Sequence, residues 1–151
     1  GLAIFSYGQP GDIPVVGDFD GDGKVDPTVF RFGTWITQRS TGGATFVSWG
    51  LSTDKLVPAD YDGDGKDDYA IYRPSDGVWW VLRSSDGNVE INQWGISTDI
   101  PAVGDFDGDG KADRTVYRDG VWYILKSTGG VSFGFFGLAG DKPIPNGYLP
   151  Q

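Results

Sequence analysis

The sequence contains no cysteine, no histidine and no methionine among its 151 residues. These absences exclude disulfides, thiolate nucleophiles, the usual zinc sites and every catalytic triad that needs a histidine base. No apolar run approaches the roughly 18 residues that a membrane helix needs, so we expect no membrane insertion. The start shows no signal-peptide pattern, and the lack of methionine favours a mature product or a part of a longer chain.

Basic residues are also few. The chain has 12 Lys and Arg against 21 Asp and Glu, which gives a formal net charge of −9. Because a nucleic-acid-binding protein normally presents a basic face, we expect no nucleic-acid partner. Aromatic residues make up 15% and hydrophobic residues 38% of the chain, so it is not a disordered acidic segment. Its length suits one domain with a hydrophobic core.

The acidic residues are concentrated in a stretch that occurs three times. The copies read GDFDGDGKVD from Gly17, ADYDGDGKDD from Ala59 and GDFDGDGKAD from Gly104. The flanking sequence repeats as well, which is typical of repeat architectures. We interpret residues 1–151 as a single repeat domain with units of about 12–53, 54–98 and 99–140 and a partial unit, 141–151. The partial unit lacks the acidic stretch, since Gly147 stands where its first Asp is expected.

Each unit is predicted to form four short antiparallel strands. In the first unit an apolar run at 13–16 precedes the acidic loop, and an alternating segment rich in β-branched and aromatic residues follows at 27–32. The third and fourth strands are expected at 34–40 and 45–50, separated by a glycine-bearing turn. No segment shows a sustained helical period. Four strands in roughly 40 to 50 residues, repeated, are typical of β-propeller blades.

The two ends add partial strands in the same register. Residues 3–8 match a fourth strand, and residues 144–147 match a first strand. The predicted fold is therefore all-β: three full four-stranded antiparallel β-propeller blades plus an extra N-terminal strand four and C-terminal strand one. Closed propellers usually need 4 to 8 blades, and unpaired strand edges favour pairing. Either a longer chain supplies the remaining blades, or the chain self-associates through its unpaired terminal strands as a ring or a filament.

The acidic loops have the spacing expected of a calcium site. In the pattern Asp-x-Asp-x-Asp-Gly-x-x-Asp, carboxylates at positions 1, 3 and 5 can turn inward, Gly at position 6 permits a sharp bend, and positions 7 and 9 offer a carbonyl and a last carboxylate. Calcium takes 6 to 8 oxygen ligands, whereas magnesium retains its waters. The three predicted Ca²⁺ sites consist of Asp18, Asp20, Asp22, Lys24 and Asp26; Asp60, Asp62, Asp64, Lys66 and Asp68; and Asp105, Asp107, Asp109, Lys111 and Asp113.

Two other interpretations of these loops are weaker. An EF-hand needs a bidentate Glu at position 12 and flanking helices, but Val29, Ile71 and Val116 stand there on predicted strands. A single Asp-rich turn can be a solvated loop, but three complete copies at matched positions favour metal binding. Because each divalent cation adds two positive charges, three of them would reduce the formal charge from −9 to −3.

The three loops, each between P-x-x-G/A and an alternating strand, resemble the FG-GAP/VCBS repeats of integrin-α-type calcium-binding β-propellers. The resemblance covers essentially the whole chain. It implies a calcium ion in the loop joining strands one and two of each blade, held by the fifteen loop residues named above, and a role in adhesion, ligand binding or display. We expect an extracellular or cell-surface location, as a secreted bacterial protein. The short unit count and the absence of Asp ligands in NGYLP (146–150) depart from a self-contained ring.

Aromatic residues and arginines also recur at fixed places. The aromatic positions are Trp35, Trp79 and Trp122 on third strands and Tyr7, Trp49, Trp94 and Phe136 near the ends of fourth strands. Their period favours packing between blades, and a sugar-stacking platform is the alternative; Trp80 and Tyr123 should face the opposite side and are better candidates for exposed contacts. Arg31, Arg73 and Arg118 are expected to pair with a nearby acid or carbonyl.

No residue pattern indicates catalysis, because every clustered carboxylate belongs to a predicted metal loop. The leading hypothesis is a non-catalytic, calcium-stabilised extracellular β-propeller module with a structural, adhesive or self-assembly role. The alternatives are a lectin-like carbohydrate-binding module and an accessory propeller of a larger secreted enzyme. A protein or glycan ligand stays open.

Overall fold

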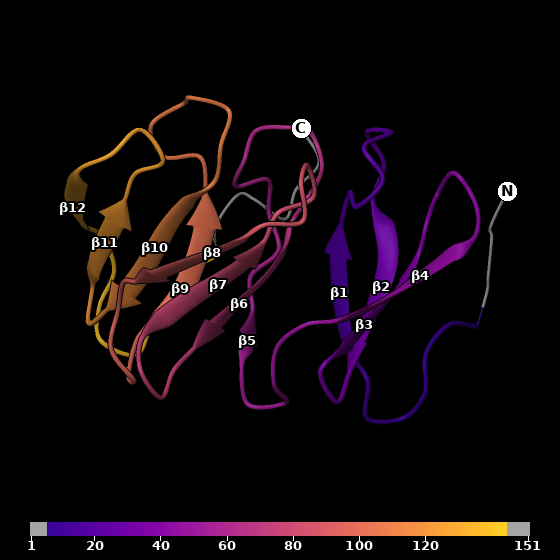
Figure 1. Cartoon of the computed structure of the whole chain (residues 1–151). Coiled ribbons are helices and arrows are strands. Elements are labelled where there is room, and N and C mark those ends of the chain that lie inside the picture. Colours follow the sequence, from indigo (N-terminus) through magenta and orange to yellow (C-terminus); the bar gives the residue numbers. More distant parts are fainter. Residues whose placement is uncertain (1–5, 145–151) are drawn as a thin grey trace, which may run out of the picture.

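The computed structural model describes residues 6–144 and arranges them in three four-stranded sheets (Figure 1). We name the sheets blade 1, blade 2 and blade 3 in chain order. Their strands are β1 Ile13–Gly17, β2 Asp26–Arg31, β3 Thr34–Gln38 and β4 Ala44–Ser48; β5 Lys55–Leu56, β6 Tyr69–Arg73, β7 Val78–Leu82 and β8 Val89–Gln93; and β9 Ile100–Gly104, β10 Asp113–Arg118, β11 Val121–Leu125 and β12 Val131–Phe135.

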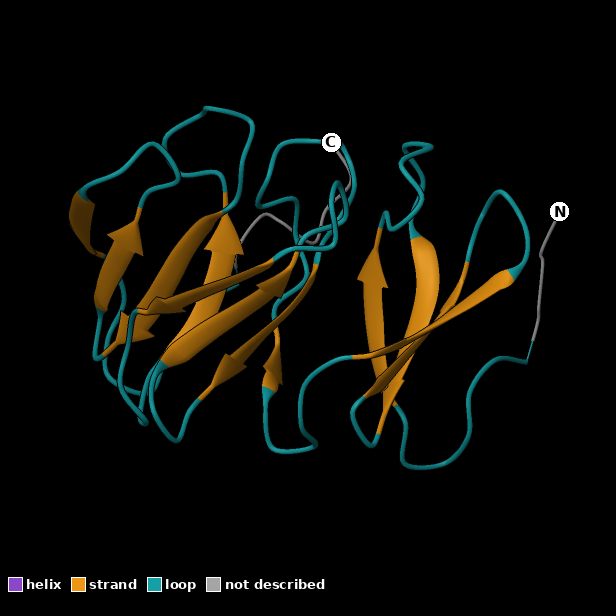
Figure 2. Cartoon of the chain, viewed as in Figure 1, coloured by secondary structure: helices purple, strands orange, loops and turns teal. Residues whose placement is uncertain are grey.

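Within each blade the strands pair antiparallel in sequence order, as a β-meander. This confirms the all-β fold class and the three four-stranded blades, with strand bounds within one or two residues of those expected. Between residues 6 and 144 there is no helix (Figure 2), and so none that could cross a membrane. The described blades stand side by side and do not close into a ring (Figure 1).

The first strand of blade 2 is shorter than its counterparts. Strand β5 has two residues, whereas β1 and β9 have five each. The pairing continues beyond it, because Val57 N donates to the Ala70 carbonyl at 3.0 Å and Ala59 forms a bridge with Asp68. Pro58 lies between these two contacts, so the pairing with β6 continues on both sides of the proline.

The hydrophobic core lies between the blades. One cluster of buried side chains joins blades 1 and 2 around Trp35, and a second joins blades 2 and 3 around Trp79. Both tryptophans are fully buried. Their indole N–H groups donate to the carbonyls of Trp49 and Trp94, at 2.9 and 2.7 Å. The prediction that the period-locked aromatics pack between blades is therefore confirmed for these two positions.

Trp80 and Tyr123, the candidates for exposed contacts, are only partly exposed. Trp80 is half-buried against the cluster between blades 1 and 2, and Tyr123 is half-buried against the cluster between blades 2 and 3. A blade in the middle of a row is covered on both faces, so the alternation of side chains along β7 directs Trp79 to one neighbour and Trp80 to the other.

The extra terminal strands fall mostly outside the described residues. Residues 3–5 and 145–147 are not described, and the described remainder, residues 6–8 and Ile144, is not assigned to a strand. One contact supports the expected register at the N-terminal end. The Tyr7 hydroxyl donates to the Ile36 carbonyl at 2.8 Å, in the manner in which the Trp94 indole donates to the Tyr123 carbonyl at 3.0 Å.

The recurring arginines pair with an acid, as expected, and that acid is the aspartate that begins each unit. Arg73 Nε and Nη2 donate to the two carboxylate oxygens of Asp54 at 2.9 and 2.8 Å. Arg31 pairs with Asp12, and Arg118 with Asp99, in the same bidentate geometry. Each pair connects strand two to the turn that enters the blade, so it fixes where the blade begins.

Replacing Arg73 by methionine is expected to destabilise the protein by roughly 3 kcal/mol, the lower end of the cost of breaking a buried ion pair. The Asp54 side chain is 0% exposed, and the substitution leaves its carboxylate without the guanidinium, which is itself 22% exposed. The measurement is urea denaturation. The matched control is Arg31→Met, where the arginine is 30% and the aspartate 6% exposed, and a smaller loss is expected. Equal losses at both positions would contradict the role given to burial.

Candidate metal centre

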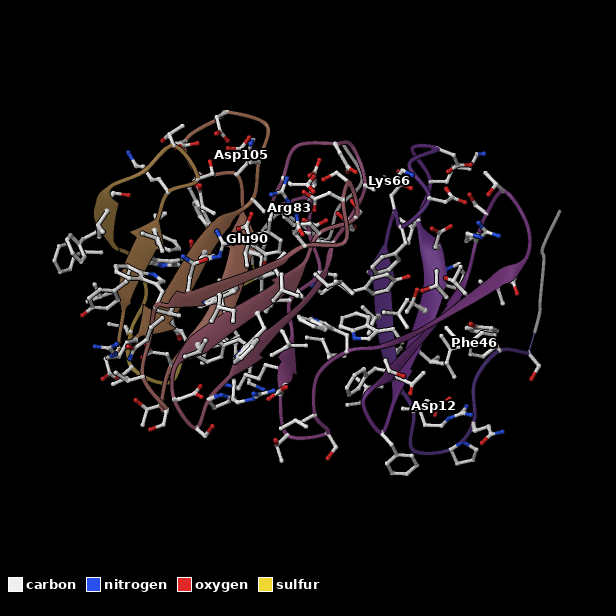
Figure 3. The ribbon with its side chains drawn as sticks, viewed as in Figure 1. Asp12, Phe46, Lys66, Arg83, Glu90 and Asp105 are labelled. Atoms are coloured by element: carbon white, nitrogen blue, oxygen red, sulfur yellow. The ribbon has the colours of Figure 1, made fainter. Side chains whose placement is uncertain are left out.

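The three acidic loops lie at one end of the blades. Each loop joins the first strand of a blade to the second, and the tight β1–β2, β5–β6 and β9–β10 pairing brings its two ends together. In Figure 3, Lys66 and Asp105 mark this end near the upper edge, while Asp12 lies near the lower edge. The aspartate–arginine pairs therefore sit at the opposite end of the molecule from the acidic loops.

Each loop gathers carboxylates closely enough to hold one cation. Three carboxylate oxygens lie within 4.8 Å of one another in every loop. The clustered residues are Asp18, Asp20 and Asp22 in blade 1, Asp60, Asp62 and Asp68 in blade 2, and Asp105, Asp107 and Asp113 in blade 3. The aspartates at positions 1 and 3 of the predicted set are therefore clustered in all three blades. The third member of the cluster is the aspartate at position 5 in blade 1 and the aspartate at position 9 in blades 2 and 3.

The aspartate at position 1 organises the loop backbone. One carboxylate oxygen of Asp18 accepts the N–H of Gly21 at 2.7 Å and the other accepts the N–H of Gly23 at 2.8 Å. The same two bonds recur at Asp60 and Asp105. Gly23 has a φ of +82°, a conformation that costs an L side chain energy, so the glycine at position 6 permits the bend as expected.

The aspartate at position 9 is fully buried and ties the loop to the sheet. One carboxylate oxygen of Asp113 accepts the N–H of Phe106 at 2.8 Å and the other accepts the N–H of Ser127 at 2.7 Å. Asp26 and Asp68 make the equivalent two bonds. Position 9 therefore has a structural role that its spacing did not reveal: it holds the acidic loop against the turn between strands three and four.

Sequence reasoning missed a pair of hydroxyl residues that support the loops. They begin the turn between strands three and four and are Ser40 and Thr41, Ser84 and Ser85, and Ser127 and Thr128. In blade 2 the Ser84 hydroxyl donates to Asp64 at 2.8 Å, and the Ser85 hydroxyl donates to Asp62 at 2.6 Å. The signal was present in the repeated STGG, SSDG and STGG turns, but only the folded blade shows that these turns lie over the loops.

One unpaired atom in blade 3 fits a cation. Asp107 Oδ2 accepts the Thr128 hydroxyl at 2.5 Å, while Asp107 Oδ1 is buried and has no hydrogen-bond donor within the described residues. A buried carboxylate oxygen without a hydrogen-bond donor is energetically costly. A hard cation could bind this oxygen together with the carboxylates of Asp105 and Asp113, which belong to the same cluster. Oxygen-only donors of this kind match the ligand preference of calcium. A bound calcium ion would supply the positive charge that these crowded carboxylates lack.

The lysines at position 7 take part through their backbones. The N–H of Lys24, Lys66 or Lys111 donates to the carboxylate at position 5 of its own loop, each at 2.9 Å. The ammonium group of Lys24 also contacts Asp22 at 2.9 Å but is largely exposed. The assignment of the three lysine carbonyls as ligands stays a prediction, as does the full ligand set of fifteen residues.

Two neighbouring carboxylates in blade 2 illustrate the electrostatic strain of the loops. Burial raises the pKa of Asp67 and that of Asp68 to about 6, although backbone N–H donors oppose the shift. The neighbouring carboxylates of Asp18 and Asp60 raise the pKa of Asp67 further. The carboxylate of Asp62 does the same for the pKa of Asp68. The physical cause is the low polarity of the site, which disfavours charged carboxylates unless a positive charge compensates them.

The loops are also joined from blade to blade. Asp67 N donates to the Asp18 carbonyl, and Ala112 N donates to the Asp60 carbonyl, both at 2.7 Å. The Lys66 side chain covers Gly21 so closely that a Cβ added there would lie 3.0 Å from it. Position 8 of one loop is therefore bonded to position 1 of the preceding loop.

Substituting Asp113 by asparagine is expected to destabilise the calcium-free protein by about 2 kcal/mol, because an amide NH₂ then faces a backbone N–H donor that needs an acceptor. The more exposed position-5 residue, Asp109, is the matched control, and Asp109→Asn should lower calcium affinity with little effect on stability in chelator. Thermal melting in chelator and calcium titration separate the two roles. Equal stability of both variants in chelator would contradict the structural role of position 9.

Comparison with known proteins adds one match. Residues 60–116 match the family model described as FG-GAP-like repeat. This segment runs from the acidic loop of blade 2 to strand β10 and includes the acidic loop of blade 3. Searches against curated proteins and against solved structures gave no significant match.

Proposed function

We propose that this chain is a non-catalytic, calcium-stabilised β-propeller module, and the match of residues 60–116 to the FG-GAP-like repeat model supports this proposal. The observation that carries the proposal is the carboxylate cluster repeated in all three strand one to strand two loops, with three oxygens within 4.8 Å in each. The buried, unpaired Asp107 Oδ1 supports it. Calcium would connect the first and second strands of each blade at one end of the blade. The Asp–Arg pair connects the second strand to the entering turn at the other end.

Calcium titration of the metal-free chain by calorimetry tests the binding directly. We expect three calcium ions per chain and no comparable heat with magnesium. The variant with Asp20→Asn, Asp62→Asn and Asp107→Asn keeps the shape of position 3 in every loop and should lose most of the affinity. The absence of binding to folded wild-type protein would refute the proposal.

The proposed setting is extracellular or at the cell surface. Sites in extracellular modules bind calcium with dissociation constants of about 10⁻⁴ to 10⁻³ M, and such weak sites fill only where calcium is plentiful. Within that setting we propose a structural, adhesive or self-assembly role. The blades supply rigid display surfaces, and the open faces of blades 1 and 3 supply contact surfaces.

A lectin-like role is the second candidate, and one cavity favours it. A cavity of about 220 Å³ between blades 1 and 2 is lined by Trp49, Ile71, Arg73 and Trp80. The guanidinium of Arg73 lies 5.3 Å from the centre of the Trp80 ring, so an aromatic face and a fixed hydrogen-bond donor meet there. A glycan array tests this role. Binding that is lost in Trp80→Ala but kept in Trp94→Ala would support it, and an array without hits for folded protein would exclude it.

No described feature favours the role of accessory propeller in a larger secreted enzyme, and that alternative stays a prediction.

A further inference from the structure

The fourth strand of each blade is a free edge. Strands β4, β8 and β12 each pair with the third strand of their own blade and have no strand on the other side within the described residues. Strand β12 lies at the left edge of the view in Figure 1. An edge strand directs every second N–H and C=O away from the sheet, where these groups can pair with another chain. The three edges differ in the side chains that accompany these groups.

The backbone bonds of β12 identify the residues that face its open edge. Phe136 N donates to the Gly120 carbonyl at 3.0 Å, and Lys126 N donates to the Gly130 carbonyl at 3.1 Å. In the register between β11 and β12, these bonds direct the even-numbered residues of β12 toward β11. Because the direction alternates along an antiparallel strand, the odd-numbered residues turn outward. The outward residues of β12 are Val131, Phe133 and Phe135.

Strand β12 differs from the other two edges in these outward side chains. The equivalent bonds in blades 1 and 2 assign to the open edges Ala44, Phe46 and Ser48 on β4 and Val89, Ile91 and Gln93 on β8. In β12 all three outward side chains are apolar and exposed: Val131 by 44%, Phe133 by 60% and Phe135 by 84%. Residues 129–138 read GGVSFGFFGL and include no charged residue, whereas exposed edges are usually guarded by charges or proline.

The exposure of these side chains belongs to the rim of the blade and not to a missing neighbour. Ile91 is the counterpart of Phe133 in blade 2, which has a blade on each side, and Ile91 is nevertheless 56% exposed. Phe133 contacts Tyr123 of β11 edge to face, with the ring centres 5.5 Å apart, and the rest of its ring stays open. The outward residues of a fourth strand thus stay accessible beside a neighbouring blade.

We propose that β12 is a self-association surface at which two copies of this chain pair antiparallel about a two-fold axis. The axis passes beside Phe133, which then lies opposite Phe133 of the second copy, while Val131 of each copy lies opposite Phe135 of the other. In this register every outward N–H and C=O of the three residues finds a partner, and their side chains form cross-strand apolar pairs. An isologous contact of this kind closes at two copies and does not grow into a filament.

The pattern of β12 favours a second copy over an unrelated partner. Its outward residues are apolar on both sides of Phe133, so the strand is complementary to itself. On the opposite face, Ser132 of one copy meets Gly134 of the other in the more closely spaced pairs, where small side chains fit best. A Cβ added at Gly134 would lie 3.7 Å from Trp122, an ordinary contact, so the blade itself does not require a glycine there.

The charge distribution favours the antiparallel direction. Val131 lies at the end of β12 next to the acidic loop of blade 3, because the turn before it contacts that loop through the bond from the Ser127 hydroxyl to Asp109. Phe135 lies at the other end of the strand. Antiparallel pairing therefore keeps the acidic loops of the two copies at opposite ends of the contact. Parallel pairing would bring these loops together in a chain whose formal net charge is −9.

The size of the contact predicts a weak dimer. An aromatic side chain buries about 150 to 250 Å², so the exposed parts of Phe133 and Phe135 amount to roughly 300 Å² in each copy. Two copies would then bury less than the roughly 1,200 to 2,000 Å² of a stable interface. We therefore expect a reversible equilibrium of monomer and dimer, with a dissociation constant on the order of 10⁻⁵ M.

Sedimentation equilibrium of the wild-type chain in calcium tests the contact. We expect the mass to rise with concentration from the 16.3 kDa of the chain to twice that value and no further. Phe133→Lys places two ammonium groups opposite each other at the axis and should weaken the dimer by roughly tenfold or more. Ile91→Lys changes the matched position on β8 and should leave the dimer unchanged. The melting temperatures of both variants verify that they are folded.

Cysteine cross-linking tests the register, and the chain contains no cysteine of its own. Opposite residues of a hydrogen-bonded pair lie about 5.5 Å apart between Cα atoms, which suits a disulfide. Phe133→Cys should therefore form a covalent dimer on oxidation. Phe135→Cys is the matched control and should stay monomeric, because position 135 lies about 13 Å along the strand from position 135 of the second copy. Equal cross-linking of the two variants would overturn the proposed pairing.

The inference deepens the proposed self-assembly role and rests on it, and the two can fail separately. A wild-type chain that stays monomeric up to about 1 mM, well above the expected dissociation constant, would refute both the surface and the self-assembly role. A dimer that Phe133→Lys does not weaken, or a filament, would refute the surface alone. The calcium proposal is independent of these outcomes and is decided by the calorimetric titration.

Discussion

Saturating the three acidic loops with calcium is expected to raise the melting temperature of the chelator-treated protein by roughly 20 °C. A ligand at a hundredfold excess over its dissociation constant stabilises the folded state by about 2.7 kcal/mol per site. Three such contributions add up to about 8 kcal/mol, and each kcal/mol shifts the melting temperature of a chain of this size by roughly 2 to 4 °C. The large effect follows from the number of sites, since each one alone is weak.

Differential scanning calorimetry with and without chelator measures this shift. Magnesium at the same concentration is the ion control, because it prefers fewer protein ligands and retains its waters. The protein control is the triple variant Asp20→Asn, Asp62→Asn and Asp107→Asn, in which the shift should largely disappear. If the melting curve of the wild-type chain is the same in excess chelator and in calcium, the metal has no part in its stability.

Truncating Trp79 to alanine is expected to cost about 3 to 5 kcal/mol of folding free energy, the usual range for a buried aromatic side chain. The ring is fully buried between blades 2 and 3, contacts Tyr72 at 5.3 Å between ring centres, and donates its indole N–H to Trp94. The truncation removes all of these contacts and leaves a cavity in the larger of the two core clusters.

Trp122→Ala is the matched control for this prediction. Trp122 contacts Tyr117 at the same 5.3 Å and donates to the Phe136 carbonyl, but no blade covers its outer face within the described chain. Measured by urea denaturation under the same conditions, its truncation should cost clearly less. Equal costs for the two variants would show that the blade interface adds nothing to the contribution of the tryptophan.

The strands could be predicted from the sequence because their signals are local. Alternating β-branched and aromatic residues identify β6 and β10, and glycine-bearing turns separate their neighbours. The repeat then supplies what one copy cannot, since three matched loops favour a binding site over a solvated turn. The Asp–Arg pairs were predictable for the same reason, because both partners recur in step.

Other features depend on contacts that no local pattern encodes. The hydroxyls of Ser84 and Ser85 reach the acidic loop only because the turn after β7 folds over that loop, from which they are separated by 20 and 23 residues along the chain. Likewise, alternation along β7 shows that Trp79 and Trp80 face opposite ways but does not say whether a second blade or solvent lies beyond Trp80. The structural role of Asp113 also needed the fold, because its spacing fits a ligand and a buried structural acceptor equally well.

The backbone bonds between successive loops imply that the proposed cation sites do not act independently. Asp18 and Asp60 lie at position 1 of their loops, and their carbonyls accept the N–H groups of Asp67 and Ala112. An ion that orders one loop therefore also positions an end of the next, which is a nearest-neighbour coupling of the kind found along repeat arrays. For the proposed calcium sites we therefore expect positive cooperativity, with the middle site coupled to both others and the two outer sites coupled only through it.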